Sequence, residues 1–325
     1  MNGDAINAIS YYALTGLLFL SAVPFFYIII FNSPSTIRVY RNTILNLACW
    51  YTIGMGTFGL FLQPIQITYF GKSCAKFAGL VSYFGFRLHV LVIVVVAIGV
   101  ANVTISMLIC FFYRYDQIRL RDQPTHLSSI RGVTMCAVLH VLMSLFAGCV
   151  AFVIVNGGEI IKHNGLFLLC FGDSNYSTIM KVAVVVATVF GFVFTGDVLL
   201  ALLTIRSLRS QRLLMSAQTY RLHLLLTVNL IMLLGLPFVF GFLPVFGASF
   251  VIFFKLDSLY LWVTISDHAP FLDAILTFVN SLLFITPYRE ALKRMFCIQR
   301  RTDRVHAISV ESATVNLHKL ESVRY

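Results

Sequence analysis

Charged residues set inside long apolar stretches are the first candidates for chemistry in this chain. Arg114 stands between Tyr113 and Tyr115 where one such stretch ends, and Asp197 lies past the middle of another. A charge in an apolar segment is costly and usually faces protein or an ion pathway. We therefore take these four as candidate switch residues, with Arg114 able to break and remake contacts. The alternatives are an ordinary basic residue at a membrane edge for Arg114 and a structural carboxylate for Asp197.

A second set of candidates gathers at the far ends of two apolar stretches, where aromatic residues occur with a few polar ones. This mixture suits a small-molecule pocket between helices, because rings supply apolar walls and polar groups fix orientation. The other interpretation is an interfacial belt of aromatic residues with loop charges. The candidate ligand-binding residues are Phe84, Arg87, His89, Asp267, His268 and Asp273.

Motifs for catalysis are missing from the sequence. Gly54, Gly56 and Gly59 match the G-x-G-x-x-G spacing, but they lie in an apolar stretch and follow no strand, so they favour close helix packing. No zinc-ligand spacing, phosphate-binding loop or catalytic triad is found, and the last apolar stretch has no Lys for a retinal Schiff base. The sequence predicts no enzyme, no metal site and no cofactor.

Seven apolar stretches must position these residues. The chain of 325 residues is 59% hydrophobic and 11% charged, whereas a soluble domain carries about 25% charge. About 20 apolar residues cross a bilayer as a helix. The sequence therefore predicts an all-α membrane protein, a seven-transmembrane helix bundle. We place its spans at 11–31, 42–63, 84–113, 132–155, 182–205, 222–246 and 265–287.

Basic residues crowd into every second gap between the spans. The first, third and fifth gaps and the segment after the last span hold 18 of the 24 Lys and Arg residues. The other six are Lys72, Lys76, Arg87, Lys162, Lys181 and Lys255. Because Lys and Arg accumulate on the cytoplasmic side, we expect the N-terminus outside and the C-terminus inside, the layout of G-protein-coupled receptors. Membrane-flanking loops also account for the net charge of +11 without a nucleic-acid partner.

Two cysteines and one sequon lie on the expected outer side. Cys74 precedes the third span and Cys170 lies in the longest outer loop, so we expect a disulfide between them; two free thiols are the alternative. Asn175 begins an Asn-Tyr-Ser glycosylation sequon, whose use the nearby fifth span leaves open.

The ends of the chain complete the expected domain organisation. Residues 1–10 form an extracellular N-terminus and residues 11–287 the seven-transmembrane domain. Residues 288–299 put apolar side chains on one face beside basic ones, which predicts an amphipathic helix on the inner leaflet. Cys297 is a palmitoylation candidate there, and residues 300–325 form a polar cytoplasmic tail that we expect to be disordered.

Short motifs occur in a definite order between about residue 10 and residue 300. They are Ser33-Pro34, Tyr40-Arg41, Leu45-Asn46, Ser73-Cys74-Ala75-Lys76-Phe77, Leu88-His89, Phe112-Tyr113-Arg114-Tyr115 and Pro287-Tyr288-Arg289. In order and spacing they resemble the nematode serpentine chemoreceptors of the Str superfamily, and most of all the Srd class. The chain departs from the Srd pattern at Lys72-Ser73, where Gly-Pro would commonly precede the Cys.

This resemblance implies a chemosensory G-protein-coupled receptor for a small odorant or pheromone. It implies signalling through a heterotrimeric G protein and a place in the plasma membrane, in the cilia of chemosensory neurons. The rivals are an odorant-gated ion channel, whose N-terminus would be inside, and a small membrane transporter, which needs a charged pathway that Asp197 alone does not make. An orphan partner subunit without a ligand is a further alternative.

Overall fold

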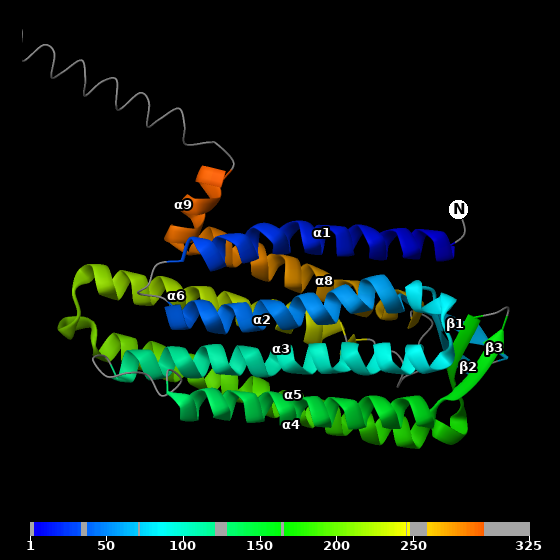
Figure 1. Cartoon of the computed structure of the whole chain (residues 1–325). Coiled ribbons are helices and arrows are strands. Elements are labelled where there is room, and N and C mark those ends of the chain that lie inside the picture. The colour runs from blue at the N-terminus through cyan, green and yellow to red at the C-terminus, as the bar shows by residue number, and fades with distance from the viewer. Residues whose placement is uncertain are drawn as a thin grey trace, which may run out of the picture.

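The protein forms a bundle of long helices that run up and down beside one another (Figure 1). A computed structural model describes residues 3–33, 38–70, 72–120, 129–163, 166–244, 246–247 and 259–295. The long helices are α1 (Gly3–Phe31), α2 (Arg38–Thr57), α3 (Phe86–Leu120), α4 (Ile130–Gly157), α5 (Asp173–Ser210), α6 (Ala217–Pro237) and α8 (Leu259–Phe284). The π-helical turns η2 (Phe58–Leu62) and η6 (Phe238–Phe242) extend α2 and α6, and η3 (Leu80–Tyr83) and η5 (Arg212–Leu214) are short 3-10 helices.

These helices confirm the seven predicted spans. Six are long and apolar enough to cross a membrane. The seventh is α8, which is followed by α9 (Thr286–Met295) after a bend of 97°. Several helices are longer than the predicted spans: α5 has 38 residues, which corresponds to about 57 Å. Hydropathy marks only the apolar part of a helix, whereas backbone hydrogen bonds continue into the polar ends.

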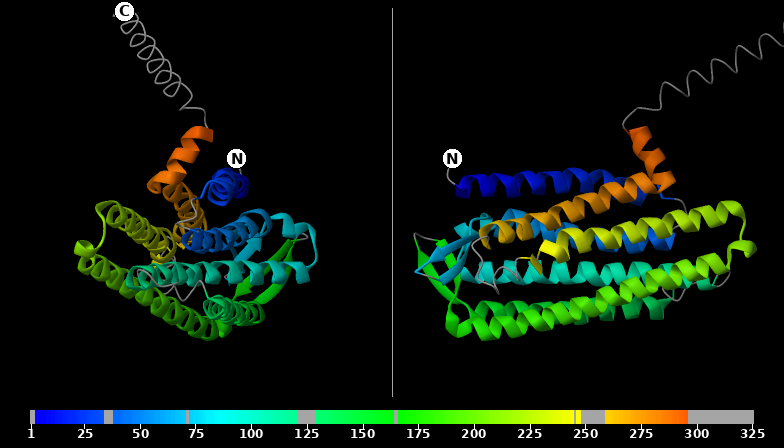
Figure 2. Two further views of the ribbon diagram at one scale, coloured as in Figure 1. Left: turned by 60° about the vertical axis from the view of Figure 1, so that its left-hand side comes forward. Right: turned by 180° about the vertical axis from the view of Figure 1, so that it is seen from behind.

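A four-stranded antiparallel sheet covers one end of the bundle, and the sequence did not predict it. Its strands are β1 (Pro64–Tyr69), β2 (Lys72–Phe77), β3 (Glu159–His163) and β4 (Leu166–Phe171), in the order β1-β2-β4-β3. The N-terminus of α1 lies at this end, which we call the sheet end, and α9 lies at the opposite end, the α9 end (Figures 1 and 2). The segments expected to be outer loops are therefore partly strands.

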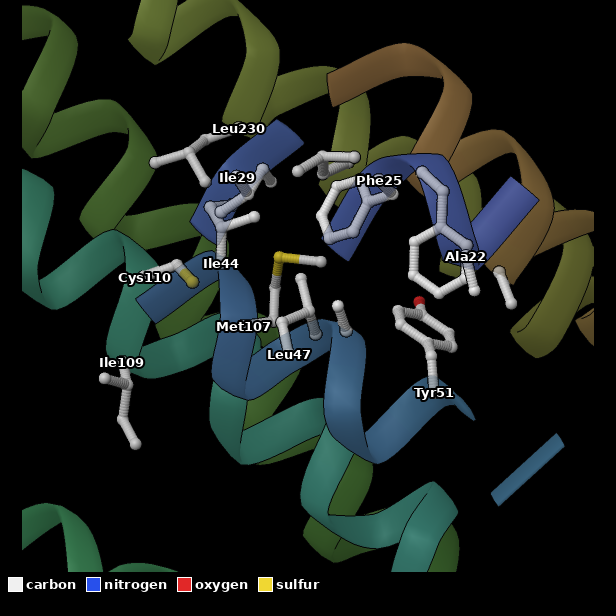
Figure 3. Packing of buried hydrophobic residues seen from close by; sticks show 14 of the residues in the cluster. Ala22, Phe25, Ile29, Ile44, Leu47, Tyr51, Met107, Ile109, Cys110 and Leu230 are labelled. Atoms are coloured by element: carbon white, nitrogen blue, oxygen red, sulfur yellow. The ribbon is translucent and has the colours of Figure 1, made fainter. Parts of the chain in front are cut away.

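Apolar side chains from several helices meet along the axis of the bundle. Figure 3 shows Phe25 of α1, Leu47 of α2, Met107 of α3 and Leu230 of α6 in one buried cluster. Lipid tails are as apolar as these side chains, so helix association in a membrane depends on close packing and on hydrogen bonds between helices.

Helices α2 and α3 pack closely at two glycines. A Cβ added to Gly99 would lie 2.6 Å from the Cα of Gly54, and one added to Gly54 would lie 3.3 Å from the carbonyl carbon of Gly99. The two backbones touch because neither residue has a side chain, as small residues at helix interfaces permit.

We expect Gly99→Ala to destabilise the protein by about 1–3 kcal/mol, because the added methyl group forces the two backbones apart. The measurement is thermal unfolding of the purified protein in detergent. Gly191→Ala on α5 is the control, since its Cβ would meet no heavy atom within 4 Å and Ala favours a helix. Equal unfolding temperatures for the two variants would contradict close α2–α3 packing.

Candidate functional site

A disulfide holds the sheet together at its centre. Cys74 of β2 and Cys170 of β4 lie opposite each other in the sheet and are bonded, 96 positions apart in the chain. Both cysteines are completely buried. An exposed ion pair between Lys72 and Glu159 adds a contact between β2 and β3. The bond closes a loop that contains α3 and α4, so it ties the sheet to the ends of these two helices.

A small recess lies between this sheet and the adjoining helices. We call it the sheet recess; its lining residues are Phe77, Phe86, His89, Ile93, Val155, Ile160, Phe167, Leu168 and Leu169. They come from α3, α4 and the strands β2, β3 and β4. The recess is narrow, with room for about one water molecule. Its walls are aromatic and aliphatic, as expected for a site that takes apolar molecules.

His89 is the polar member of this lining. It is 1% exposed, and its ring packs against Phe167 and Phe77, with centroid distances of 5.0 and 6.0 Å. Nδ1 lies 3.4 Å from the carbonyl oxygen of Gly85, whereas Nε2 has no hydrogen-bond partner among the described residues. A buried polar atom without a partner is rare in proteins and calls for an explanation.

The other predicted ligand-binding residues do not join His89. Phe84 and Arg87 are exposed and do not line the recess. Asp273 is buried on α8, where the Tyr51 hydroxyl donates to its Oδ2 at 2.8 Å. The structure therefore does not form the single pocket that the sequence suggested.

His268 and Asp267 belong to a third place, where α8 meets α1. The His268 ring stacks on Tyr11 with a centroid distance of 4.4 Å, and its Nε2 is hydrogen-bonded to Ser10 Oγ at 2.7 Å. Asp267 lies near the Tyr11 hydroxyl. The candidates separate because α8 packs mainly on α1, α2 and α6, while α3 packs mainly on α2, α4 and α5.

At the α9 end, Arg114 links α3 to α6. Its guanidinium is completely buried; Nη2 donates to the carbonyl oxygen of His223 at 2.6 Å and Nε to Thr227 Oγ1 at 3.4 Å. Nη1 donates to Gln117 Oε1 on the same helix at 2.6 Å. No Asp or Glu carboxylate lies within 4.0 Å of it in the described part of the chain. Among the described residues, only neutral oxygen atoms contact this charge.

Two more hydrogen bonds join helices around Arg114. Asn229 of α6 donates to the Tyr40 hydroxyl of α2 at 3.1 Å, and Ser33, after α1, is bonded to the Tyr288 hydroxyl of α9 at 3.0 Å. Tyr113 is buried and lies against the backbone of Tyr40, whereas Tyr115 is partly exposed. We call the Arg114 contacts with His223 and Thr227 the α3–α6 latch.

Asp197 does not take part in this latch. It is 1% exposed on α5, and its Oδ1 has no hydrogen-bond partner among the described residues. Cys110 of α3 is near enough to interact with it electrostatically. The amide of Asn229 and the guanidinium of Arg114 donate to other groups.

A polar network joins α2, α3 and α4. His140 Nδ1 is bonded to Asn102 Oδ1 at 2.6 Å and His140 Nε2 to Asn46 Nδ2 at 3.0 Å, and Asn102 donates to Ser144 at 2.8 Å. Each ring nitrogen has a partner, so this His holds helices together.

The structure describes one of the two modification candidates. Asn175 falls in the first turn of α5 at the sheet end. Cys297 lies outside the described residues. The sequence did not predict the wall residues from β2, β3 and β4, such as Phe77, Ile160 and Phe167, because these strands are too short for their pattern to distinguish a strand from a helix.

Comparison with known families matches residues 5–298 to the model of the serpentine-type seven-transmembrane G-protein-coupled chemoreceptors Srh. The Srd class expected from the short motifs is corrected to Srh, because the match weighs residues along nearly the whole chain. This family is a class of receptors and not of enzymes. No curated protein matches the chain.

We expect Cys170→Ser to lower the unfolding temperature and the amount of protein at the cell surface. A disulfide across a loop of about 100 residues stabilises by roughly 4–5 kcal/mol in the chain-entropy model. Cys149→Ser, which replaces an exposed free cysteine of α4, is the control and should behave as the original protein. Identical surface levels and unfolding curves for both variants would show that the sheet needs no covalent tie.

Proposed function

Because the chain belongs to the Srh family of serpentine seven-transmembrane chemoreceptors, which are G-protein-coupled receptors, we propose that it detects a small odorant or pheromone and activates a heterotrimeric G protein. The ligand binds at the sheet end and the G protein at the α9 end. The receptor lies in the plasma membrane, in the cilia of chemosensory neurons. The α3–α6 latch is the observation that carries this proposal.

The latch has the properties of a switch between two bundle states. Arg114 spans the gap between α3 and α6 with hydrogen bonds to neutral oxygen atoms, and no acidic partner among the described residues compensates its charge. Moving α6 away from α3 breaks these bonds and leaves Nε and Nη2 of the Arg114 guanidinium without hydrogen-bond acceptors on α6. A G protein can supply one. A ligand that favours the open state shifts the equilibrium between the two states.

Helix α3 connects the two proposed sites. His89 lies near its first turn and Arg114 near its last turns, 25 residues apart and so about 38 Å along the helix. A shift at the sheet end therefore reaches the latch through one continuous element. Asp197, buried against α3 near Cys110, is a further switch candidate on this path.

The orientation in the membrane follows from charge. The basic residues of the α3, α5 and α9 ends face the cytoplasm, and Lys72, Lys76 and Lys162 on the sheet face outward, as the positive-inside rule requires. The α9 helix has exposed Arg289, Lys293 and Arg294, and it turns through 97° from α8, which suits a helix lying on the inner leaflet.

We expect an epitope tag at the N-terminus to be accessible in intact cells, and a C-terminal tag only after permeabilisation. The physical reason is the excess of Lys and Arg at the α9 end. Antibody labelling of both tagged forms is the measurement. An inaccessible N-terminal tag would reverse the topology and favour an odorant-gated channel, which electrical recording would then test.

We expect Arg114→Ala to abolish G-protein activation and to leave surface expression intact. The assay is a panel of small volatile compounds applied to cells with a G-protein reporter. Arg119→Ala removes the same charge from an exposed position five residues further along α3 and is the matched control. Ligand-evoked signals of equal size in Arg114→Ala and Arg119→Ala would remove Arg114 from the mechanism.

A further inference from the structure

One ring nitrogen of His89 has its hydrogen-bonding capacity unused inside an apolar recess. His89 lines the sheet recess and is 1% exposed, and its Nε2 has no partner among the described residues. The free-energy cost of leaving a buried polar atom unpaired is about 1–3 kcal/mol. In the network around His140, by contrast, both ring nitrogens are bonded. A purely structural role does not explain His89.

The hydrogen bond at Nδ1 decides what Nε2 can do. The carbonyl oxygen of Gly85 can only accept, so Nδ1, 3.4 Å away, must be the donor. A neutral imidazole carries a single N–H, and the other nitrogen then presents a lone pair. Nε2 is therefore a hydrogen-bond acceptor in an apolar surrounding.

From these two observations we propose that the sheet recess binds a small apolar molecule with one hydroxyl group, an alcohol or a phenol, whose O–H donates to His89 Nε2. This inference rests on the proposed receptor function and specifies its ligand class. The rings of Phe77, Phe86 and Phe167 form walls suited to an aromatic or aliphatic body. The single acceptor, His89 Nε2, fixes the position of the ligand's hydroxyl group.

The recess must widen for such a ligand, because it has room for about one water molecule. The more exposed lining residues are the ones able to move: Phe86 and Phe167 are partly exposed, and Ile160 is 42% exposed. Phe86 is the first residue of α3. Ligand entry therefore displaces the first turn of the helix that ends in the α3–α6 latch. Small ligands are favoured over bulky ones.

The ligand class can be tested with two isomers of equal size. 4-Methylphenol carries a hydroxyl donor, whereas anisole has only an ether oxygen, which cannot donate. We expect 4-methylphenol to bind about tenfold more tightly, since one buried hydrogen bond separates the two. The measurement is ligand titration by NMR on the full-length receptor in lipid nanodiscs, without G protein. Empty nanodiscs give the lipid background.

Variants test whether His89 causes the preference for 4-methylphenol over anisole. His89→Phe keeps a ring of similar size but removes the acceptor, so the two isomers should bind it equally. Tyr83→Ala changes an 85% exposed residue that does not line the recess, and it should keep the tenfold preference. In protein labelled with ¹⁵N-histidine, 4-methylphenol should shift the Nε2 resonance that is lost in His89→Phe, and anisole should not.

Three results would overturn the proposal: equal affinity for both isomers in the original protein, a preference that persists in His89→Phe, or no binding of 4-methylphenol above the lipid background. If His89→Phe does not fold, Val155→Leu fills the recess and leaves the ring in place. This variant should bind both isomers at least tenfold more weakly. An unchanged affinity would show that the isomers bind outside the recess.

The same assay separates this inference from the proposed function. Arg114→Ala should still bind 4-methylphenol about tenfold more tightly than anisole, because the hydrogen bond to His89 Nε2 separates the two isomers in either state of the latch. A hydroxyl preference that depends on His89, found in a protein that activates no G protein, would support the ligand class and refute the signalling role. G-protein activation by a protein that lacks this preference would support the signalling role and refute the ligand class.

Discussion

The backbone contact between α2 and α3 at Gly54 and Gly99 is the constraint on which the bundle depends. It brings the backbones of α2 and α3 into contact, and α3 also packs on α4 and α5. His89 and Arg114 are both parts of this helix. One tightly seated element therefore sets the position of the sheet recess at one end and of the α3–α6 latch at the other.

Hydrogen bonding separates the polar groups that hold the bundle together from those available for function. Lipid offers no hydrogen-bond partners, so helices must satisfy their polar side chains among themselves. Asn46, Asn102 and His140 do so across three helices. Arg114 is held by neutral acceptors alone, and His89 keeps an unpaired nitrogen within the described structure. We propose that these two side chains are the ones available to a partner.

Much of this arrangement was predictable from local patterns. Apolar length located the seven helices, and Gly54 indicated a close helix contact. Cys74 and Cys170, on the same side of the predicted spans, are the pair that the structure joins. The sheet was not predictable, because its strands have only five or six residues. A short apolar run such as Leu166–Phe171 has the same pattern in a strand as in a buried helix.

The sequence by itself determined the number of helices, their order and the distribution of charge between their ends, since these depend on composition along the chain. Only the tertiary structure decided which helices are neighbours. It placed Asp267 and His268 against α1, Asp273 against Tyr51 of α2, and His89 beneath the sheet. A membrane helix is apolar on its lipid face and on its core face alike, so its pattern does not reveal which face meets protein. Contacts among distant segments supply that information, and the recess and the latch consist of such contacts.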